Sequence, residues 1–199
     1  MNLALDHWHI EPSGICTLKC PRCPRAELPY YSINKNLSLE FFQKQLGYDV
    51  ISKIKKITFC GNNGDPIYCK DLLDILQWIK SINPAIEFVI ITNGSYKPVE
   101  WWEELSGIMT ENDEIHWSID GWDQQSNEQY RVNSDWVSIM TGIREFRKHN
   151  TVTYTTWATI AFVFNENHIA DILQLANQFE FDLFQLTLST KFGSKYPDS

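Results

Sequence analysis

Short apolar runs alternate with longer amphipathic runs along nearly the whole sequence, with a repeat of roughly 30 residues. Alternation of this kind predicts parallel strands joined by right-handed helical crossovers. We expect six strands, at His7–Pro12, Lys56–Cys60, Glu87–Thr92, Glu114–Ile119, Thr155–Phe164 and Leu183–Ser189. The helices expected between them are Leu39–Ile54, Leu72–Ile82, Val99–Ile108, Trp136–His149 and His168–Phe179.

Six strand–helix units are too few to close an eight-stranded barrel at its usual length of about 250 residues. The sequence therefore predicts an α/β fold: an open, partial (β/α)6 TIM-like barrel of parallel strands, with its active face at their carboxyl ends. We expect a single domain over residues 1–199, with a long loop at 14–37 and a polar tail at 191–199. Further expectations concern single residues: helix N-caps at Ser38, Asp71 and Asn167, and barrel-lining positions for Trp8, Trp117 and Trp157.

The charge of the chain restricts its partners. The 199 residues carry a net charge of −8, which argues against broad binding to nucleic acid or to an anionic membrane. No apolar run approaches the roughly 18–20 residues that span a bilayer, and the first residues lack the basic and then apolar pattern of a signal peptide. We therefore expect a cytoplasmic protein. A local exception to the acidic balance is the basic group Lys19, Arg22 and Arg25.

The long loop after the first predicted strand carries three of the chain's five cysteines, Cys16, Cys20 and Cys23. Three thiolates at this spacing can converge on one centre, and in a cytosolic protein such groups are more often metal ligands than disulfides. A structural zinc site takes four protein ligands, so three cysteines favour a cluster or metal with one open position. The alternatives are a zinc knuckle completed by His7 or His9, and unliganded core thiols.

Polar residues also follow the later predicted strands. Glycines and a carboxylate after the second strand form either a ligand-binding loop or an ordinary turn. An Asn-Gly pair follows the third strand, and Ser118 and Asp120 alternate with apolar residues at the end of the fourth, so both can point into the barrel. An arginine lies eleven residues after Asp120, either in the site or on the solvated surface. The candidate residues are Gly64, Asp65, Asn93, Ser118, Asp120 and Arg131.

Together these segments resemble the motifs of the radical S-adenosylmethionine superfamily, from Glu11 to about Phe192. The resemblance implies a [4Fe–4S] cluster held by the three cysteines, with S-adenosylmethionine on its fourth iron. It further implies that Gly64 and Asp65 lie at the cofactor's amino group, Asn93, Ser118 and Asp120 near the rest of the cofactor, and Arg131 at its carboxylate. The sequence departs from the pattern at Asn63, at Asp65 in place of glutamate, and at Arg22 in place of an aromatic residue beside the adenine.

The function that the resemblance implies is reductive cleavage of S-adenosylmethionine to a 5′-deoxyadenosyl radical, which abstracts hydrogen from a substrate. The nearest branch modifies peptides or proteins and adds a cysteine-rich (SPASM-type) C-terminal domain, which this sequence does not contain. The substrate, a peptide, a protein or a small molecule, is not named by the sequence. A reductant such as flavodoxin or ferredoxin is the expected partner, and no nucleic acid or membrane is expected. The competing hypotheses are a degenerate relative that binds without turnover and a zinc-stabilised binding module.

Overall fold

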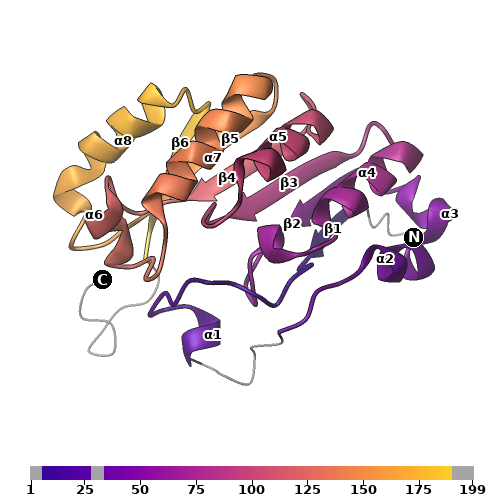
Figure 1. The fold of residues 1–199 in the computed structure, drawn as a ribbon, viewed down its shortest axis with the longest axis horizontal. Helices are drawn as coiled ribbons and strands as arrows, with labels where there is room; N and C mark the ends of the chain where they lie inside the picture. Colours follow the sequence, from indigo (N-terminus) through magenta and orange to yellow (C-terminus); the bar gives the residue numbers. More distant parts are fainter. Residues whose placement is uncertain (1–5, 28–33, 190–199) are drawn as a thin grey trace, which may run out of the picture.

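A computed structural model describes residues 6–27 and 34–189 of the chain. The predicted tail at 191–199 lies outside the described residues. Within them, six parallel strands form one sheet in the order β1-β2-β3-β4-β5-β6, which confirms the predicted α/β fold with a partial, barrel-like arrangement (Figure 1). The strands are β1 (His7–Ile10), β2 (Lys56–Phe59), β3 (Glu87–Thr92), β4 (Glu114–Ser118), β5 (Tyr154–Ala161) and β6 (Leu183–Leu188).

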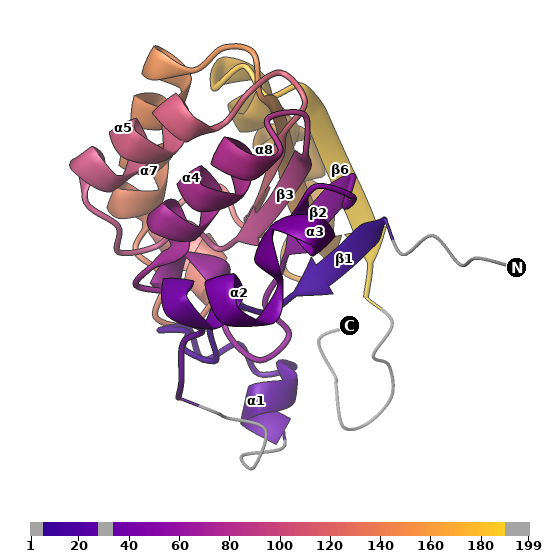
Figure 2. The same cartoon turned by 90° about the vertical axis from the view of Figure 1, so that its right-hand side faces the viewer.

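Helices follow the strands in the predicted alternation. Three of them have the predicted bounds: α4 (Leu72–Ile82), α5 (Val99–Ile108) and α7 (Trp136–His149). The others are α1 (Pro24–Glu27), α2 (Leu39–Gln45), α3 (Gly47–Ile51), α6 (Gln124–Glu128) and α8 (Ile169–Gln178), with 3-10 turns η2 (Pro66–Tyr68) and η3 (Glu166–His168). In Figures 1 and 2, α4, α5, α7 and α8 all lie on one face of the sheet, and the cysteine loop with α1 lies beyond the carboxyl ends of the strands.

The prediction of one helix over Leu39–Ile54 is wrong, because the chain breaks there into α2 and α3. Gly47 has a φ of +57°, which is a left-handed conformation that glycine adopts without steric cost. The apolar period continues across the break, so the amphipathic pattern alone does not reveal it. Ser38 is the N-cap of α2 as predicted, and its hydroxyl accepts a hydrogen bond from the amide of Phe41 at 3.1 Å.

Two further expectations about element ends need correction. The fifth strand ends at Ala161 rather than Phe164, because the side chain of Asn165 closes a turn there. Its Nδ2 atom donates to the Ile160 carbonyl, and its Oδ1 atom accepts from the backbone amide of Phe162. The N-cap of α8 is His168, not Asn167. Asp71 is the N-cap of α4, but its carboxylate accepts from the Leu39 amide at 3.0 Å and so joins α4 to α2 instead of capping its own helix.

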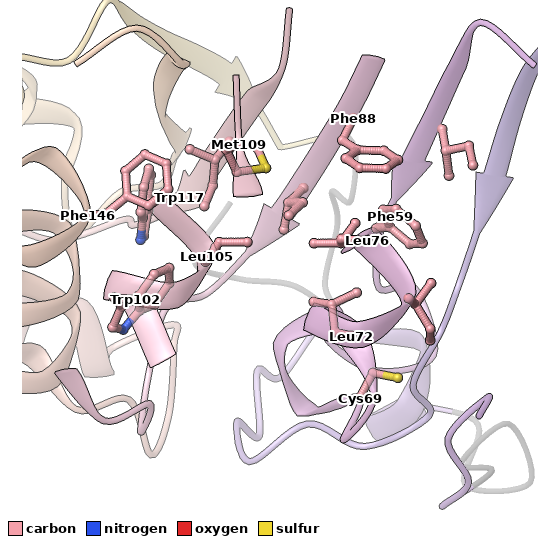
Figure 3. Close-up of a cluster of buried hydrophobic side chains, with 14 of the residues drawn as sticks. Phe59, Cys69, Leu72, Leu76, Phe88, Trp102, Leu105, Met109, Trp117 and Phe146 are labelled. Atoms are coloured by element: carbon pink, nitrogen blue, oxygen red, sulfur yellow. The ribbon is translucent and has the colours of Figure 1, made fainter. Parts of the chain in front are cut away.

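The main hydrophobic core fills the space between the sheet and its helices (Figure 3). Trp117 of β4 is fully buried and packs against Trp102 of α5 and Phe146 of α7, with ring centroids 5.7 Å and 5.6 Å away. Trp157 lies beside Trp117 in the sheet register and is fully buried as well. The expectation that these two tryptophans line the barrel is therefore wrong, since both point to the helices.

The inner face of the sheet, which points away from the helices, carries polar side chains. His7 on β1 bonds to Thr58 on β2, with 2.9 Å between the ring nitrogen and the hydroxyl. Glu114 on β4 pairs with Lys56 at 3.1 Å and with His116 at 3.0 Å. Among the described residues no helix has the length and apolar character needed to cross a bilayer.

Candidate functional site

A cavity of about 210 Å³ lies at the carboxyl ends of the strands, between them and the cysteine loop. All but one of the predicted site residues line it. Cys16, Cys20 and Cys23 come from the loop after β1. The residues that face them follow β2, β3 and α6 or end β4: Gly64, Asp65, Asn93, Arg131 and Ser118. The exception is Asp120, which is fully buried and lies behind the cavity wall.

Hydrogen bonds fix the cysteine loop in place at several points. The Lys19 amide donates to the Val132 carbonyl at 2.9 Å, and the Asn133 side chain donates to the Thr17 carbonyl at 3.0 Å. Arg25 folds back over the loop and donates from Nη2 to the Cys16 carbonyl at 3.0 Å. The loop therefore rests on the chain after α6, which also contributes Arg131 to the cavity.

Gly64 allows two loops to pack closely at the cavity. A Cβ atom at this position would lie 2.0 Å from the Ser13 carbonyl oxygen and 2.8 Å from the Gly14 carbonyl carbon. The next residue continues the contact, because the Asp65 amide donates to the Ile15 carbonyl at 2.9 Å. Glycine is therefore required here by the approach of the loop after β2 to the cysteine loop.

Asp65 lies at the centre of a hydrogen-bond network. Its carboxylate accepts from the Ile67 amide and the Thr92 hydroxyl through one oxygen, and from the amide and side chain of Asn93 through the other, at 2.5 to 3.2 Å. Burial raises the pKa of Asp65, and these hydrogen bonds oppose the rise. Both oxygens are engaged, so Asp65 holds Asn93 in position. The side-chain Nδ2 atom of Asn93 lies 3.6 Å from the Cys16 sulfur.

Arg131 is held by Asp120 through its Nε atom, which donates to Oδ2 of the carboxylate at 2.6 Å. Burial lowers the pKa of Arg131, but the neighbouring acidic groups, Asp120 first among them, and the hydrogen bond to Asp120 together outweigh burial and raise the pKa, so the guanidinium stays charged. Among the residues that the structure describes, the two Nη atoms have no hydrogen-bond partner, while Arg131 lines the cavity. The arrangement presents a fixed cation that can bind a carboxylate by two parallel hydrogen bonds.

An aromatic hollow lies beside the cavity. Its volume is about 360 Å³, and its walls include Tyr130, Phe162 and Arg22. The rings of Tyr130 and Phe162 lie 4.4 Å apart, and the Arg22 guanidinium lies 5.2 Å from the Phe162 ring centroid. Arg22 also donates to the Ser189 hydroxyl at 2.9 Å. The aromatic residues after β5 are the signal in the sequence that indicates this wall.

Burial disfavours the charged form of two of the three thiols as long as no cationic group is bound. Burial raises the pKa of Cys16 to about 12, with Asp65 adding to the rise, and burial also raises the pKa of Cys20. Without a metal, Cys16 and Cys20 are protonated at neutral pH, whereas bound iron or zinc stabilises the thiolate. The donor set is therefore one that a metal or an iron–sulfur cluster would complete.

The spacing of the cysteine sulfurs can be compared with the spacing that a single zinc ion needs and with the spacing that a [4Fe–4S] cluster needs. Within the described parts of the chain, only Glu103, Glu145 and His149 bring three potential ligand atoms within 4.8 Å of one another. At least one pair of the three cysteine sulfurs is therefore more than 4.8 Å apart. Tetrahedral zinc, with bonds of about 2.3 Å, needs sulfurs about 3.8 Å apart, whereas cysteines of a [4Fe–4S] cluster bind different irons and stand wider. The wide spacing fits the cluster.

Neither histidine proposed as a fourth zinc ligand lines the cavity. His7 bonds to Thr58, as described above, and the Nδ1 atom of His9 lies 3.5 Å from the sulfur of Cys60. Both residues belong to β1 and to the inner face of the sheet. The zinc-knuckle hypothesis thus has no fourth ligand from these histidines.

Comparison with solved structures shows the same fold in larger proteins. SuiB from Streptococcus suis superposes with a TM-score of 0.72 at 14% identity, over 98% of this chain and 42% of SuiB. A structure of anSMEcpe with bound AdoMet and Cp18Cys peptide gives 0.71 at 17% identity, over 97% of this chain and 54% of that protein. For methylornithine synthase (PylB) the values are 0.65 and 14%, over 92% and 52%. The chain thus spans about half the length of these proteins.

No curated protein matches the sequence. A family model does: residues 10–176 match the model described as the Radical SAM superfamily. The match begins within β1, includes the cysteine loop and ends within α8, so it contains every residue that lines the cavity. Since the matched residues make up most of the chain, this protein belongs to the radical S-adenosylmethionine (radical SAM) superfamily.

Proposed function

We propose that this protein binds a [4Fe–4S] cluster through Cys16, Cys20 and Cys23, binds S-adenosylmethionine beside it, and cleaves this cofactor reductively. When bound, the cluster supplies one electron, which breaks the bond between the sulfonium sulfur and C5′ and yields the radical that abstracts hydrogen from a substrate. The observation that carries the proposal is that the three thiols share one cavity with polar groups from the ends of three strands.

The roles of the polar residues follow from their hydrogen bonds. Arg131 offers two Nη atoms that have no partner within residues 6–27 and 34–189, and a fixed positive charge, which suit the carboxylate of the methionine part. Ser118 is half-buried in the cavity wall, and its hydroxyl has no recorded partner among the described residues, so it is available to a ribose or carboxylate oxygen. Asp65 is a positioning residue, because all its hydrogen-bonding capacity serves Asn93 and its neighbours.

The aromatic hollow suits the adenine ring. Tyr130 and Phe162 offer ring faces on which a flat base can stack, and the guanidinium of Arg22 adds a third planar surface. The hollow shares Arg22 and Tyr130 with the cavity that contains the cysteines, so one elongated ligand can occupy both. Arg22 would therefore take the place of the aromatic residue that other members carry at this position.

For the substrate we favour a peptide or protein. The support is the fold shared with SuiB, which has been crystallised bound to the precursor peptide SuiA, and with anSMEcpe, which has been crystallised with a peptide. The identities are 15% and 17%, so these likenesses support a peptide as the class of substrate but do not indicate the amino-acid sequence of that peptide. An electron donor such as flavodoxin or ferredoxin is part of the proposal.

A second candidate is a relative that binds the cofactor without turning it over. The observation that favours it is the full engagement of Asp65, which leaves no carboxylate oxygen for the amino group of the cofactor. The two candidates predict the same cluster and differ in the formation of 5′-deoxyadenosine.

Anaerobic reconstitution tests both candidates. Purified protein is incubated with iron and sulfide, and iron, sulfide, zinc and 5′-deoxyadenosine are measured after addition of S-adenosylmethionine and dithionite. We expect a cluster and 5′-deoxyadenosine in the wild type and neither after Cys16, Cys20 and Cys23 are all changed to Ala. Cys60→Ala, which changes a thiol outside the cavity, should retain both.

The outcomes separate the hypotheses. A cluster without 5′-deoxyadenosine supports binding without turnover, and stoichiometric zinc without a cluster supports the zinc module. Equal product formation by the triple variant contradicts the assignment of the three cysteines.

A further inference from the structure

One polar side chain in the wall of the cysteine-lined cavity has no part in the function proposed above. Asn62 follows β2 and lines the cavity. Its Nδ2 atom donates to Oε1 of Glu11 at 2.9 Å, and Oε2 of the same carboxylate accepts from the backbone amide of Asn63 at 2.7 Å. Glu11 follows β1, the neighbour of β2 in the sheet, and is not itself a lining residue of the cavity. The Glu11 carboxylate therefore holds the loop after β2 at two points.

The carboxylate of Glu11 determines how the amide group of Asn62 is turned. A carboxylate accepts hydrogen bonds and donates none, so the NH2 group of Asn62, and not its oxygen, faces Glu11. The Oδ1 atom of Asn62 is then left for another partner, and no donor to it is found among residues 6–27 and 34–189. Asn62 thus carries an oriented and unoccupied hydrogen-bond acceptor on a residue that lines the cavity.

S-adenosylmethionine has an amino group that needs an acceptor of this kind. When its nitrogen gives the lone pair to iron, two N–H groups remain, and each of them costs free energy if it is buried without a partner. In the family pattern a loop carboxylate serves this amino group, and Asp65 stands at that position. Both oxygens of Asp65 already accept from neighbouring groups. An amino group bound here therefore needs another acceptor.

The other polar side chains around the cavity leave few acceptors for it. The side-chain oxygens of Thr92 and Asn93 each already accept from a backbone amide, at 3.0 Å and 2.9 Å. The arginine side chains only donate. The hydroxyls of Ser118 and Tyr130 belong to β4 and to the chain after α6, the part of the wall already proposed to hold the carboxylate, ribose and adenine. Within the described residues, Asn62 is thus the available side-chain acceptor in the loop after β2.

We propose that Oδ1 of Asn62 accepts a hydrogen bond from the amino group of S-adenosylmethionine, and that Glu11 is the positioning residue that turns this oxygen away from itself and toward the ligand. The inference rests on the proposed function, because it needs the cofactor in this cavity. It also gives the amino group an acceptor in a chain whose Asp65 is fully engaged: the acceptor lies three residues earlier in the same loop.

The first experiment compares two ligands that differ only in the amino group. Reconstituted protein is titrated anaerobically by calorimetry with S-adenosylhomocysteine and with 4-(5′-adenosylthio)butanoate, which is the same molecule without its amino group. We expect Asn62→Ala to weaken binding of S-adenosylhomocysteine by about three- to tenfold, the effect of one lost hydrogen bond. Binding of the butanoate should change by less than about twofold, because it has no N–H group for Asn62 to accept.

The second experiment tests the positioning role of Glu11. Glu11→Gln keeps the shape of the side chain, and its oxygen can still accept from the Asn63 amide. Its NH2 group then faces the NH2 group of Asn62, so the Asn62 amide has to turn over and present a donor to the ligand. We expect S-adenosylhomocysteine to bind about tenfold or more weakly, with a larger loss than in Asn62→Ala. The double variant Glu11→Gln/Asn62→Ala should return to the affinity of Asn62→Ala alone.

The matched controls make the same two changes at the opposite end of the strands. Glu111→Gln and Asn112→Ala alter exposed residues between α5 and β4 and should leave both affinities within about twofold of the wild type. Equal weakening of the two ligands by Asn62→Ala, or no weakening of either, would overturn the assignment of Asn62. A smaller loss in Glu11→Gln than in Asn62→Ala, or losses that add in the double variant, would overturn the positioning role of Glu11.

Formation of 5′-deoxyadenosine separates this proposal from the proposed function. If the wild type forms none from S-adenosylmethionine and dithionite, reductive cleavage is wrong, while the comparison of the two ligands still decides the role of Asn62. If the wild type forms 5′-deoxyadenosine and Asn62→Ala shows no loss that depends on the amino group, reductive cleavage stands and the assignment of Asn62 is wrong.

Discussion

Arg131 and Asp120 form a buried ion pair behind the cysteine-lined cavity, with 2.6 Å between Nε and Oδ2. The other carboxylate oxygen accepts from the backbone amide of Ile160 on β5 at 2.7 Å. Asp120 is fully buried, and the Arg131 side chain is 16% exposed. The Asp120 carboxylate therefore holds both the carboxyl end of β5 and the Arg131 guanidinium that faces the cavity.

Changing Asp120 to Asn should cost about 3 kcal/mol of unfolding free energy, because it leaves a buried guanidinium without its counter-charge. Urea unfolding of the metal-free protein measures the loss. If the two residues are coupled, the double variant Asp120→Asn/Arg131→Met loses less than the sum of the single variants. Strictly additive losses would contradict a coupled pair.

Gly64→Ala should disrupt the contact between the loop after β2 and the cysteine loop, because the new Cβ would lie 2.0 Å from a backbone oxygen that cannot move aside alone. We expect a loss of about 2 kcal/mol or more in unfolding free energy and a lower iron content after reconstitution. Gly107→Ala in α5 is the control, since a Cβ there meets no atom within 4 Å. It should stabilise the protein by about 0.5–1 kcal/mol.

The sequence was sufficient to predict the elements whose signals are local. The bounds of α4, α5 and α7 follow from their apolar period and from the polar or proline residue before each. The break at Gly47 was missed because a glycine between two amphipathic segments is compatible with both a kinked helix and two helices. Strand alternation places Trp117 and Ser118 on opposite faces, but it does not tell which face the helices cover.

The sequence predicts which residues meet at the candidate site. It does not predict the hydrogen bonds that each of them makes there. Parallel strands bring their carboxyl ends to one edge, so Asp65, Asn93 and Ser118 were expected to meet there. Which hydrogen bonds each residue makes depends on contacts between distant loops. Asp65 uses both oxygens on its neighbours, and Asp120 reaches the cavity only through Arg131. Spacing along the chain carries no information on either point.

The raised pKa of Cys16, about 12 against an ordinary value of 9.0, makes the metal-free protein sensitive to alkaline pH. The folded state holds this proton more tightly than the unfolded state. The part of the unfolding free energy that comes from this difference in pKa is therefore fully present below pH 9.0 and is lost as the pH rises toward about 12. Between about pH 9 and 10.5 we expect Cys16 to account for a loss of about 1.6 kcal/mol.

Urea unfolding across this pH range measures the loss. Cys16→Ser, which removes the buried thiol, should flatten the dependence. Burial raises the pKa of Cys60 as well, but less than that of Cys16, so Cys60→Ser should flatten the dependence to a smaller extent. An equal pH dependence of the wild type and Cys16→Ser would contradict the assignment.

Phe162→Ala should weaken binding of S-adenosylhomocysteine by about 1–3 kcal/mol, the range for loss of one stacked base, if the aromatic hollow holds the adenine. Binding of methionine should change little, since methionine has no base. Val163→Ala is the control, because Val163 lines the same hollow but is 54% exposed. Calorimetric titration with both ligands measures the difference, and equal weakening of both ligands by Phe162→Ala argues against a stacking role.

Asp65→Asn keeps the shape of the side chain and replaces one hydrogen-bond-accepting oxygen with a donating NH2 group. All four groups that bond to Asp65 are donors: the amides of Ile67 and Asn93, the Thr92 hydroxyl and the Asn93 side chain. The new NH2 group would face donors in a buried site, which should cost about 1–3 kcal/mol of unfolding free energy. Asn93 would lose its anchor, and the iron content after reconstitution should fall with it.

Asp71→Asn is the matched control for this change. The Asp71 carboxylate accepts one recorded hydrogen bond, from the Leu39 amide, and the oxygen retained by asparagine can still accept it. Urea unfolding and iron analysis of both variants should therefore show a large effect at Asp65 and a small one at Asp71. Because a residue that only bound the amino group of S-adenosylmethionine would leave the metal-free protein stable, a loss of stability at Asp65 without cofactor distinguishes positioning from direct binding.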